Sequence, residues 1–538
     1  MAARRLVGRI SALAGNRRHT PHRGSRERRC NGCGFCLHAR GGGNPRTGSA
    51  ADDRLRPQSW RGTLPVKTAA TAARPWTSAA VPAATYRYAL SIPQGARRKL
   101  AVGWLTLGLV SLIASGVFSV LLVLSRAPYV KDVFPLVDFF HVALVVHVDL
   151  SVLVWFLAFA GVFWSLNSTP RFIGAGWAAL TLAVTGATLM SLAPFVGRGN
   201  PVMSNYVPVL EDPFFLWGLG IFAAGFVVLV VRSMAAVPLV GMNLSGQGAL
   251  RFGLNSALVS AAVAIFAFAW SWWAMPAGVE SRTYYEILFW GGGHVIQFTY
   301  TLLMFVAWLW LATALDFRLP LSPRVSVLLF GIGLASVFLT PVVYLGHDVG
   351  SVQHHNFLTW IMRIGGGLAI APFALALVIG MARSGAQAQR EQALFGSLIA
   401  SLAVFGVGGI IGFMIHGSNV KIPAHYHGCI VGVTLAFMGL TYHLLPQLGF
   451  AKPVGRLAAW QPYVYGGGQL LHILGLVWSG GYGVQRKVAG GAQALRSTEE
   501  IVAMGIMGFG GLVAAVGGLI FLIVVVRAIF AAHRGGST

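Results

Sequence analysis

Residues 286–316 read EILFWGGGHVIQFTYTLLMFVAWLWLATALD, an apolar run with acidic residues only at its two ends. About 20 apolar residues in an α-helix cross the hydrocarbon core of a bilayer. The run is long enough to do so, and His294 lies inside it. The stretch therefore predicts a membrane-spanning helix that carries an imidazole at membrane depth, which is a candidate functional group.

Further runs of this kind occur throughout the chain from residue 100 onward. The twelve predicted spans are 101–125, 136–166, 172–197, 214–232, 252–274, 286–316, 322–345, 356–382, 393–415, 424–448, 458–480 and 501–530. Their hydropathy is continuous rather than alternating, which excludes an outer-membrane β-barrel. The expected fold class is all-α: a polytopic membrane protein with twelve transmembrane helices.

Composition agrees with this prediction. Of the 538 residues, 56% are hydrophobic and 10% are charged, whereas a soluble domain carries roughly 25% charged residues. A soluble enzyme and a disordered chain are thereby excluded. The net charge of +25 is concentrated near the N-terminus, where residues 1–100 hold 20 of the 40 Lys and Arg residues. The charge is mainly a property of that segment and does not indicate nucleic-acid binding.

Two regions are expected: a basic, disordered tail over 1–95 and a twelve-helix catalytic domain over 96–538. The tail is rich in Arg, Gly, Ser, Ala and Pro. A transit peptide, a membrane-surface segment and a start codon assigned too early all remain open for it, and the last is favoured. Cys30, Cys33 and Cys36 in the tail lack the continuation of an iron–sulfur motif and are interpreted as chance cysteines.

The distribution of basic residues predicts the orientation. Fourteen basic residues flank the spans on the side of residue 97, and eight flank them on the other side. Because basic loops stay in the cytoplasm, both termini are expected there, in what is expected to be a bacterial inner membrane.

Six histidines are predicted to lie in the outer half of the bilayer: His147, His294, His354, His355, His425 and His427. Two residues apart on a helix, His425 and His427 project about 200° from each other and can serve different centres. His354 and His355 fall at a junction of spans, where irregular backbone can turn both rings toward one ion. With His294 they form a three-imidazole set that suits copper.

These motifs resemble the catalytic subunit I of the haem–copper oxidase superfamily. The resemblance covers residues from about 100 to 538 and rests on Gly291-Gly292-Gly293-His294, Gln353-His354-His355-Asn356 and Ala424-His425-Tyr426-His427-Gly428. It implies two haems of unknown subtype and one copper, CuB, a non-haem iron being the less favoured metal. It assigns CuB to His294, His354 and His355, the high-spin haem to His425, and the low-spin haem to His427 and His147.

Two assignments within the resemblance have rivals. The run His147-Val-Asp149-Leu150 is similar to a nitric oxide reductase motif, with His141 as the alternative haem ligand six residues earlier. Arg486 and Lys487 resemble residues that pair with haem propionates, and ordinary loop charges are the alternative.

The favoured reaction is reduction of nitric oxide to nitrous oxide. Oxidases of the superfamily carry a redox tyrosine at positions that correspond here to Phe298 or Asp348. Without that phenol, the two-electron reduction of two NO molecules is easier than the four-electron cleavage of dioxygen. One departure argues the other way: the glutamate that helps bind iron in well-known nitric oxide reductases is replaced here by Phe298, which leaves a three-histidine site that points to copper. A terminal cytochrome c or quinol oxidase that reduces dioxygen to water stays open as the alternative.

A twelve-helix transporter is a more remote alternative, which leaves the paired histidines unexplained. The sequence has no copper-dimer or Cys-x-x-Cys-His motif. A partner subunit of the cytochrome c or copper-dimer type is therefore expected to deliver electrons on the outer side. Asp149, Glu286, Asp348 and Arg363 are candidates for a proton route.

Overall fold

The computed structural model describes residues 86–124, 139–197, 199–241, 244–385, 391–486 and 495–535. The predicted tail before residue 86, with its three cysteines, lies outside these residues. From residue 86 the chain runs to the first helix, and Tyr88 is fully buried on the way. Its backbone nitrogen donates to Thr313 Oγ1 at 2.8 Å and its hydroxyl donates to the Leu321 carbonyl at 2.7 Å. These bonds fix the described start of the chain to the helical domain.

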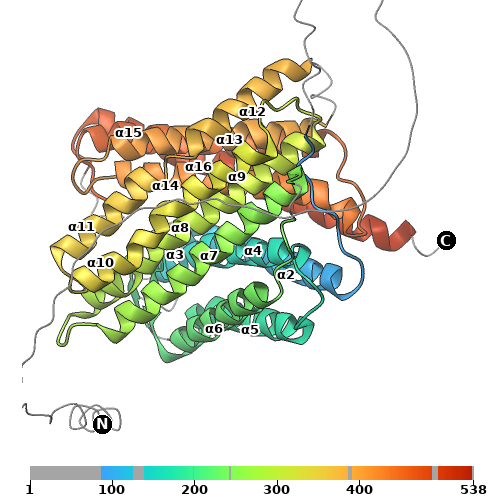
Figure 1. Ribbon diagram of the computed structural model, residues 1–538. Helices are drawn as coiled ribbons and strands as arrows, with labels where there is room; N and C mark the ends of the chain where they lie inside the picture. The colour runs from blue at the N-terminus through green and yellow to red at the C-terminus, as the bar shows by residue number, and fades with distance from the viewer. Residues whose placement is uncertain are drawn as a thin grey trace, which may run out of the picture. The chain divides into compact units, whose positions relative to one another are not determined.

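Twelve helical segments follow in the described chain, and each overlaps one predicted span (Figure 1). They are α2 (Ala96–Leu124), α3–η2–α4 (Phe139–Val148, Asp149–Val154, Trp155–Leu166), α5 (Ile173–Val196), α6 (Pro213–Ala235), α7 (Gly246–Trp273), α8 (Ser281–Ala314), α9–η3–α10 (Pro323–Ala335, Ser336–Leu339, Thr340–Gly346), α11–η4–α12 (Val352–Trp360, Ile361–Gly365, Ile370–Ser384), α13 (Gln392–Phe413), α14 (Lys421–Gln447), α15 (Arg456–Gly481) and α16 (Thr498–Gly535).

Eleven of these segments are long and apolar enough to cross a membrane. The remaining one, α15, has 26 residues but includes Gln461, Gln469, His472 and several glycines. It packs against α13, α14 and α16. The predicted all-α, multi-pass membrane fold is confirmed.

Helices α8 and α14 form the centre of the domain. In the most apolar 18-residue window of each helix, 94% of the residues are buried in α8 and 83% in α14. In each of the other spans the buried share is 67% or less. These two helices carry His294, His425 and His427. His294 lies within the buried part of α8, whereas His425 and His427 lie in the first turns of α14, before its most buried stretch, and are half-buried.

Local irregularities occur near the histidines. A π-helical turn, Asp149–Val154, begins two residues after His147, and such turns are frequent at functional sites. A short antiparallel hairpin of β1 (Asn200–Val202) and β2 (Val209–Glu211) joins α5 to α6, with Pro201 paired to Leu210. Its tip, residues 203–208, reaches α8. The sequence pattern did not predict the hairpin, because strands of three residues leave no periodic signal.

Candidate functional site

His147 is anchored to α2 through one ring nitrogen. Its Nδ1 lies 2.9 Å from the Ser115 carbonyl oxygen and 3.0 Å from Ser115 Oγ. A backbone acceptor at Nδ1 fixes the tautomer and leaves Nε2 as the nitrogen that can accept, which is the arrangement usual in metal-binding imidazoles. The rival His141 lies six residues earlier on the same helix, with its ring edge-on to Phe140.

His425 and His427 leave α14 on different sides, as the spacing predicts. His425 faces α13, where its Nδ1 lies 2.8 Å from the Gly408 carbonyl oxygen. His427 faces α15 and packs edge-on against His472, with 4.6 Å between ring centroids. His427 also lies within electrostatic range of His147. One helix thus presents two imidazoles to two separate surroundings.

His294 is held by its own helix and by the hairpin. Its Nδ1 lies 2.8 Å from the Trp290 carbonyl oxygen one turn earlier. The Tyr206 hydroxyl lies 2.9 Å from Nδ1 and 3.0 Å from Nε2. Because the Trp290 carbonyl can only accept, Nδ1 carries the proton and Nε2 is the free acceptor. The Tyr206 oxygen is almost equidistant from the two ring nitrogens, so it does not lie along the Nε2 lone pair, where a metal would bind.

His354 and His355 diverge in the structure. Both lie in the regular first turns of α11, which is capped by the hydroxyl of Ser351 accepting from His354 N at 3.2 Å. His354 is buried and its ring meets Tyr344 edge-on, with centroids 4.7 Å apart. His355 is exposed and stacks on Trp290, with centroids 3.3 Å apart. The expectation of irregular backbone at this pair was wrong, because consecutive residues in a regular helix point about 100° apart.

The three expected copper ligands are neighbours, but they do not converge on one point. His294 and His355 both pack against the ring of Trp290. Among the described residues, no group of three or more His, Cys, Asp or Glu is close enough to hold one ion. A shared metal site for these three imidazoles stays a prediction.

The donor atoms nevertheless fit metal and haem ligation. His354 Nε2 is buried without a hydrogen-bond partner, and an unsatisfied buried nitrogen is costly unless something binds it. In His147 and His425 a backbone carbonyl accepts from Nδ1, so the ring presents Nε2. Together with His294, whose Nδ1 lies against the Trp290 carbonyl, three imidazoles have Nδ1 bound to a backbone carbonyl, and His354 has a buried Nε2 without a partner.

The hairpin tip is clamped from two sides. Asn205 donates through its backbone nitrogen and its Nδ2 to the Glu286 carboxylate, at 3.2 and 2.7 Å. Arg486 donates to Asn205 Oδ1 at 3.2 Å and to Ser418 Oγ at 3.3 Å. Arg486 thus joins the loop after α15 to the hairpin, and Lys487 lies outside the described residues.

Tyr206 has an unusual backbone conformation. Its φ is +69°, one of three positive values at non-glycine residues in the described chain, and such strain clusters at functional sites. Burial raises the pKa of the Tyr206 phenol; the Glu286 carboxylate adds to the rise, and the Arg486 guanidinium opposes it. The hydroxyl is therefore protonated at neutral pH.

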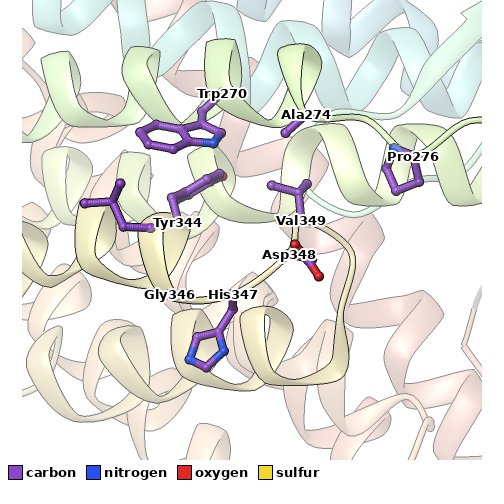
Figure 2. Close-up of a pocket in the computed structure, with 9 residues that line it drawn as sticks. Trp270, Ala274, Pro276, Tyr344, Gly346, His347, Asp348 and Val349 are labelled. Atoms are coloured by element: carbon purple, nitrogen blue, oxygen red, sulfur yellow. The ribbon is translucent and has the colours of Figure 1, made fainter. Parts of the chain in front are cut away.

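A surface pocket of about 430 Å³ opens near the His pair, between the ends of α7 and α10 (Figure 2). Trp270, Pro276, Tyr344, His347 and Asp348 contribute to its wall. The Tyr344 hydroxyl points away from His354, because it bonds to Ser271 Oγ at 2.7 Å and to the Ala267 carbonyl at 3.1 Å. Asp348, which stands where some oxidases of the family carry the redox tyrosine, is exposed and lines this pocket.

Sequence reasoning missed three residues of this region. Tyr206 is 88 positions from His294, so no local spacing indicates it. His472, whose Nδ1 lies 2.9 Å from the Met507 carbonyl, faces His427 from a helix without a recognisable motif. Trp290, which touches His294, Tyr206 and His355, could have been flagged because it lies one turn before His294.

Comparison with known proteins identifies the architecture. Residues 99–520 match the family model described as Cytochrome C and Quinol oxidase polypeptide I. The chain belongs to this family. It is therefore a subunit of a haem–copper-type membrane oxidoreductase, and the transporter alternative is not supported.

Two relatives and one solved structure extend the match. A Rickettsia prowazekii (strain Madrid E) protein named uncharacterized protein RP382 is 27% identical over 497 residues, covering 80% of this chain and 96% of that protein. An uncharacterized protein of Aquifex aeolicus (strain VF5) is 26% identical over 361 residues, covering 67% and 88%. A heme-copper terminal oxidase dimer solved by cryo-EM is 17% identical, has a TM-score of 0.59, and is matched over 82% of this chain and 84% of that one. This structural likeness supports the fold.

Proposed function

We propose that the chain is the catalytic subunit of a respiratory reductase with two haems and one copper, CuB. The observation that carries this proposal is that His425 and His427 leave α14 on different sides. His425 is fixed against α13 and His427 faces α15 within range of His147. Two imidazoles with separate surroundings on one helix can serve two haem irons. An electron-transfer protein with a single haem would not need this arrangement.

The proposed roles follow the family pattern. His147 and His427 hold the low-spin haem and His425 holds the high-spin haem. His294, His354 and His355 hold copper, with His354 Nε2 as a ready ligand. Arg486 and Lys487 pair with haem propionates, and Arg486 keeps one donor on the hairpin. When bound, the haems and the copper supply the electrons; the protein places the imidazoles and excludes water.

Nitric oxide is the proposed substrate: two NO, two electrons and two protons give one N2O and one water. The ring of Phe298, at one family position of the redox phenol, is buried and has no oxidisable hydroxyl. Asp348, at the other, lines an open pocket. Protons are proposed to enter from the outer side through Glu286, whose carboxylate is hydrogen-bonded to the hairpin beside His294.

Dioxygen reduction is the second candidate, and one observation favours it. The Tyr206 phenol touches His294 from a position outside either family pattern. A phenol there could give the fourth electron that cleavage of dioxygen requires. The Tyr344 hydroxyl is less suited, because it is engaged with Ser271 and Ala267 rather than with a histidine.

The proposed assembly is a multi-pass protein of a bacterial inner membrane with both termini in the cytoplasm. A cytochrome c or copper-dimer subunit delivers electrons on the outer side. The hairpin bonds to Glu286 near the start of α8, and α11 packs against the same helix, so these elements belong to the end of the domain assigned to that side.

Turnover of the purified complex tests the substrate. With ¹⁵N-labelled NO under argon, mass spectrometry should detect doubly labelled N2O at one molecule per two NO consumed. A His425→Ala variant should produce none. Fast dioxygen uptake without N2O formation would reject nitric oxide in favour of the second candidate.

A further inference from the structure

The ring of His427 is supported by side chains of α15. In His147, His294 and His425, by contrast, a backbone carbonyl lies against Nδ1. The amide of Gln469 hydrogen-bonds the His427 ring. His472 packs edge-on against the same ring, with 4.6 Å between centroids. Gln469 and His472 are three residues apart on α15, so they share one face of that helix.

His472 is itself fixed by α16. Its Nδ1 lies 2.9 Å from the Met507 carbonyl oxygen. Because a carbonyl can only accept, Nδ1 of His472 carries the proton. Gly511 lies so close that an added Cβ would come within 3.2 Å of that nitrogen. The imidazole of His472 is therefore held in one orientation and forms a firm wall beside His427.

Gln469 meets His427 with one end of its amide and buries the other. Its Oε1 is buried without a hydrogen-bond partner among the described residues, so the Nε2 group is the end that meets the ring. A buried acceptor without a partner costs free energy. The two ends of an amide have nearly the same shape, and a half-turn of the side-chain amide exchanges them. The oxygen can therefore take the place of the nitrogen beside His427 without any movement of α15.

We propose that Gln469 is the positioning residue of His427, and that its Oε1 accepts the proton on the ring nitrogen that does not face the haem iron. The inference rests on the proposed function, because it needs a low-spin haem at His427. A histidine that binds a metal through one nitrogen almost always donates the N–H of the other to an oxygen acceptor. At His427 the amide oxygen fills the role that a carbonyl fills at His147 and His425. The same bond satisfies the buried oxygen.

This acceptor should tune the low-spin haem. A hydrogen bond at the second nitrogen makes an imidazole more basic, which favours the oxidised iron and lowers the reduction potential. Without the acceptor, the preference for the oxidised haem should fall about tenfold, which is a rise of about 59 mV for one electron. The high-spin haem proposed at His425 has its own acceptor in the Gly408 carbonyl and should not shift.

Spectroelectrochemical titration of the purified complex tests the proposal. Gln469→Leu removes the oxygen and should raise the low-spin potential by that amount, with altered g values in its electron paramagnetic resonance signal. Gln469→Glu retains an acceptor oxygen and should leave the potential at or below that of the wild type. Gln461→Leu is the matched control, because Gln461 is also a buried glutamine on α15 but bonds to Tyr442 and to the Gly517 carbonyl; both of its haem potentials should match the wild type.

Each outcome bears on the role of the amide oxygen. An unchanged low-spin potential in Gln469→Leu, or an equal shift in Gln461→Leu, would overturn the inference. If Gln469→Leu loses both haems, Gln469→Glu decides. A six-coordinate haem at or below the wild-type potential then supports the proposal, and a raised potential or a lost haem refutes it. A wild type without a six-coordinate haem, or one whose six-coordinate haem survives His427→Ala, would instead reject the proposed function.

Discussion

Single glycines at the residue scale decide whether the aromatic side chains can reach the histidines. Gly291 and Gly293 on α8 lie against Tyr344 and Tyr206, and a methyl group at either would overlap the neighbouring ring. The Gly-Gly-Gly-His run therefore has a steric function that the motif alone does not reveal. With Gly292, which lies against Phe268, the run lets three aromatic rings approach α8.

Gly293→Ala should displace the Tyr206 ring and weaken the site. Overpacking of this kind costs about 1–3 kcal/mol, and the phenol would lose its bond to His294. Thermal unfolding in detergent and chelator competition measure the two effects. Gly116→Ala is the control, since nothing lies within 4 Å of the added carbon there. Equal melting temperatures and metal affinities in the two variants would contradict the predicted role of Gly293.

At the scale of helices and hairpins, the apolar runs predicted every span because bilayer thickness imposes a length that composition reveals. The hairpin escaped prediction, since its pairing is set by contacts with α8 and Arg486 rather than by its own pattern. The opposite sides of α14 were predictable from a two-residue spacing. The divergence of His354 and His355 was not foreseen, because the sequence does not show that Ser351 starts a regular helix there.

The contact between α13 and α14 gives an element-scale prediction. A Cβ at Gly408 would lie 2.6 Å from Cys429 N, and the Gly408 carbonyl accepts from His425. Gly408→Ala should push the helices apart and release the ring of His425. The haem content measured by the pyridine haemochrome method should fall from two per chain toward one.

The neighbouring glycine provides the matched control. Gly409 lies on the same helix, with nothing within 4 Å of an added Cβ. Gly409→Ala should keep both haems. If both variants retain two haems, close packing of α13 on α14 does not hold His425 in place.

On the scale of the whole molecule, the predicted orientation puts the hairpin and the histidines toward the outer side. A green fluorescent protein fused after Thr538 should fluoresce in a bacterial host, because it folds in the cytoplasm. Alkaline phosphatase inserted after Gly417, between α13 and α14, should be active because it needs the periplasm. The reverse pair of results would invert the topology and move the proposed electron donor to the cytoplasmic side.

The central claim is that one haem is bound by His147 of α3 and His427 of α14. Its most direct test is the low-spin haem spectrum of three variants of the purified complex. His147→Ala and His427→Ala should each abolish the six-coordinate signal while the high-spin haem bound to His425 remains. His141→Ala should leave the spectrum unchanged. A six-coordinate signal that survives His147→Ala and disappears with His141→Ala would contradict the account.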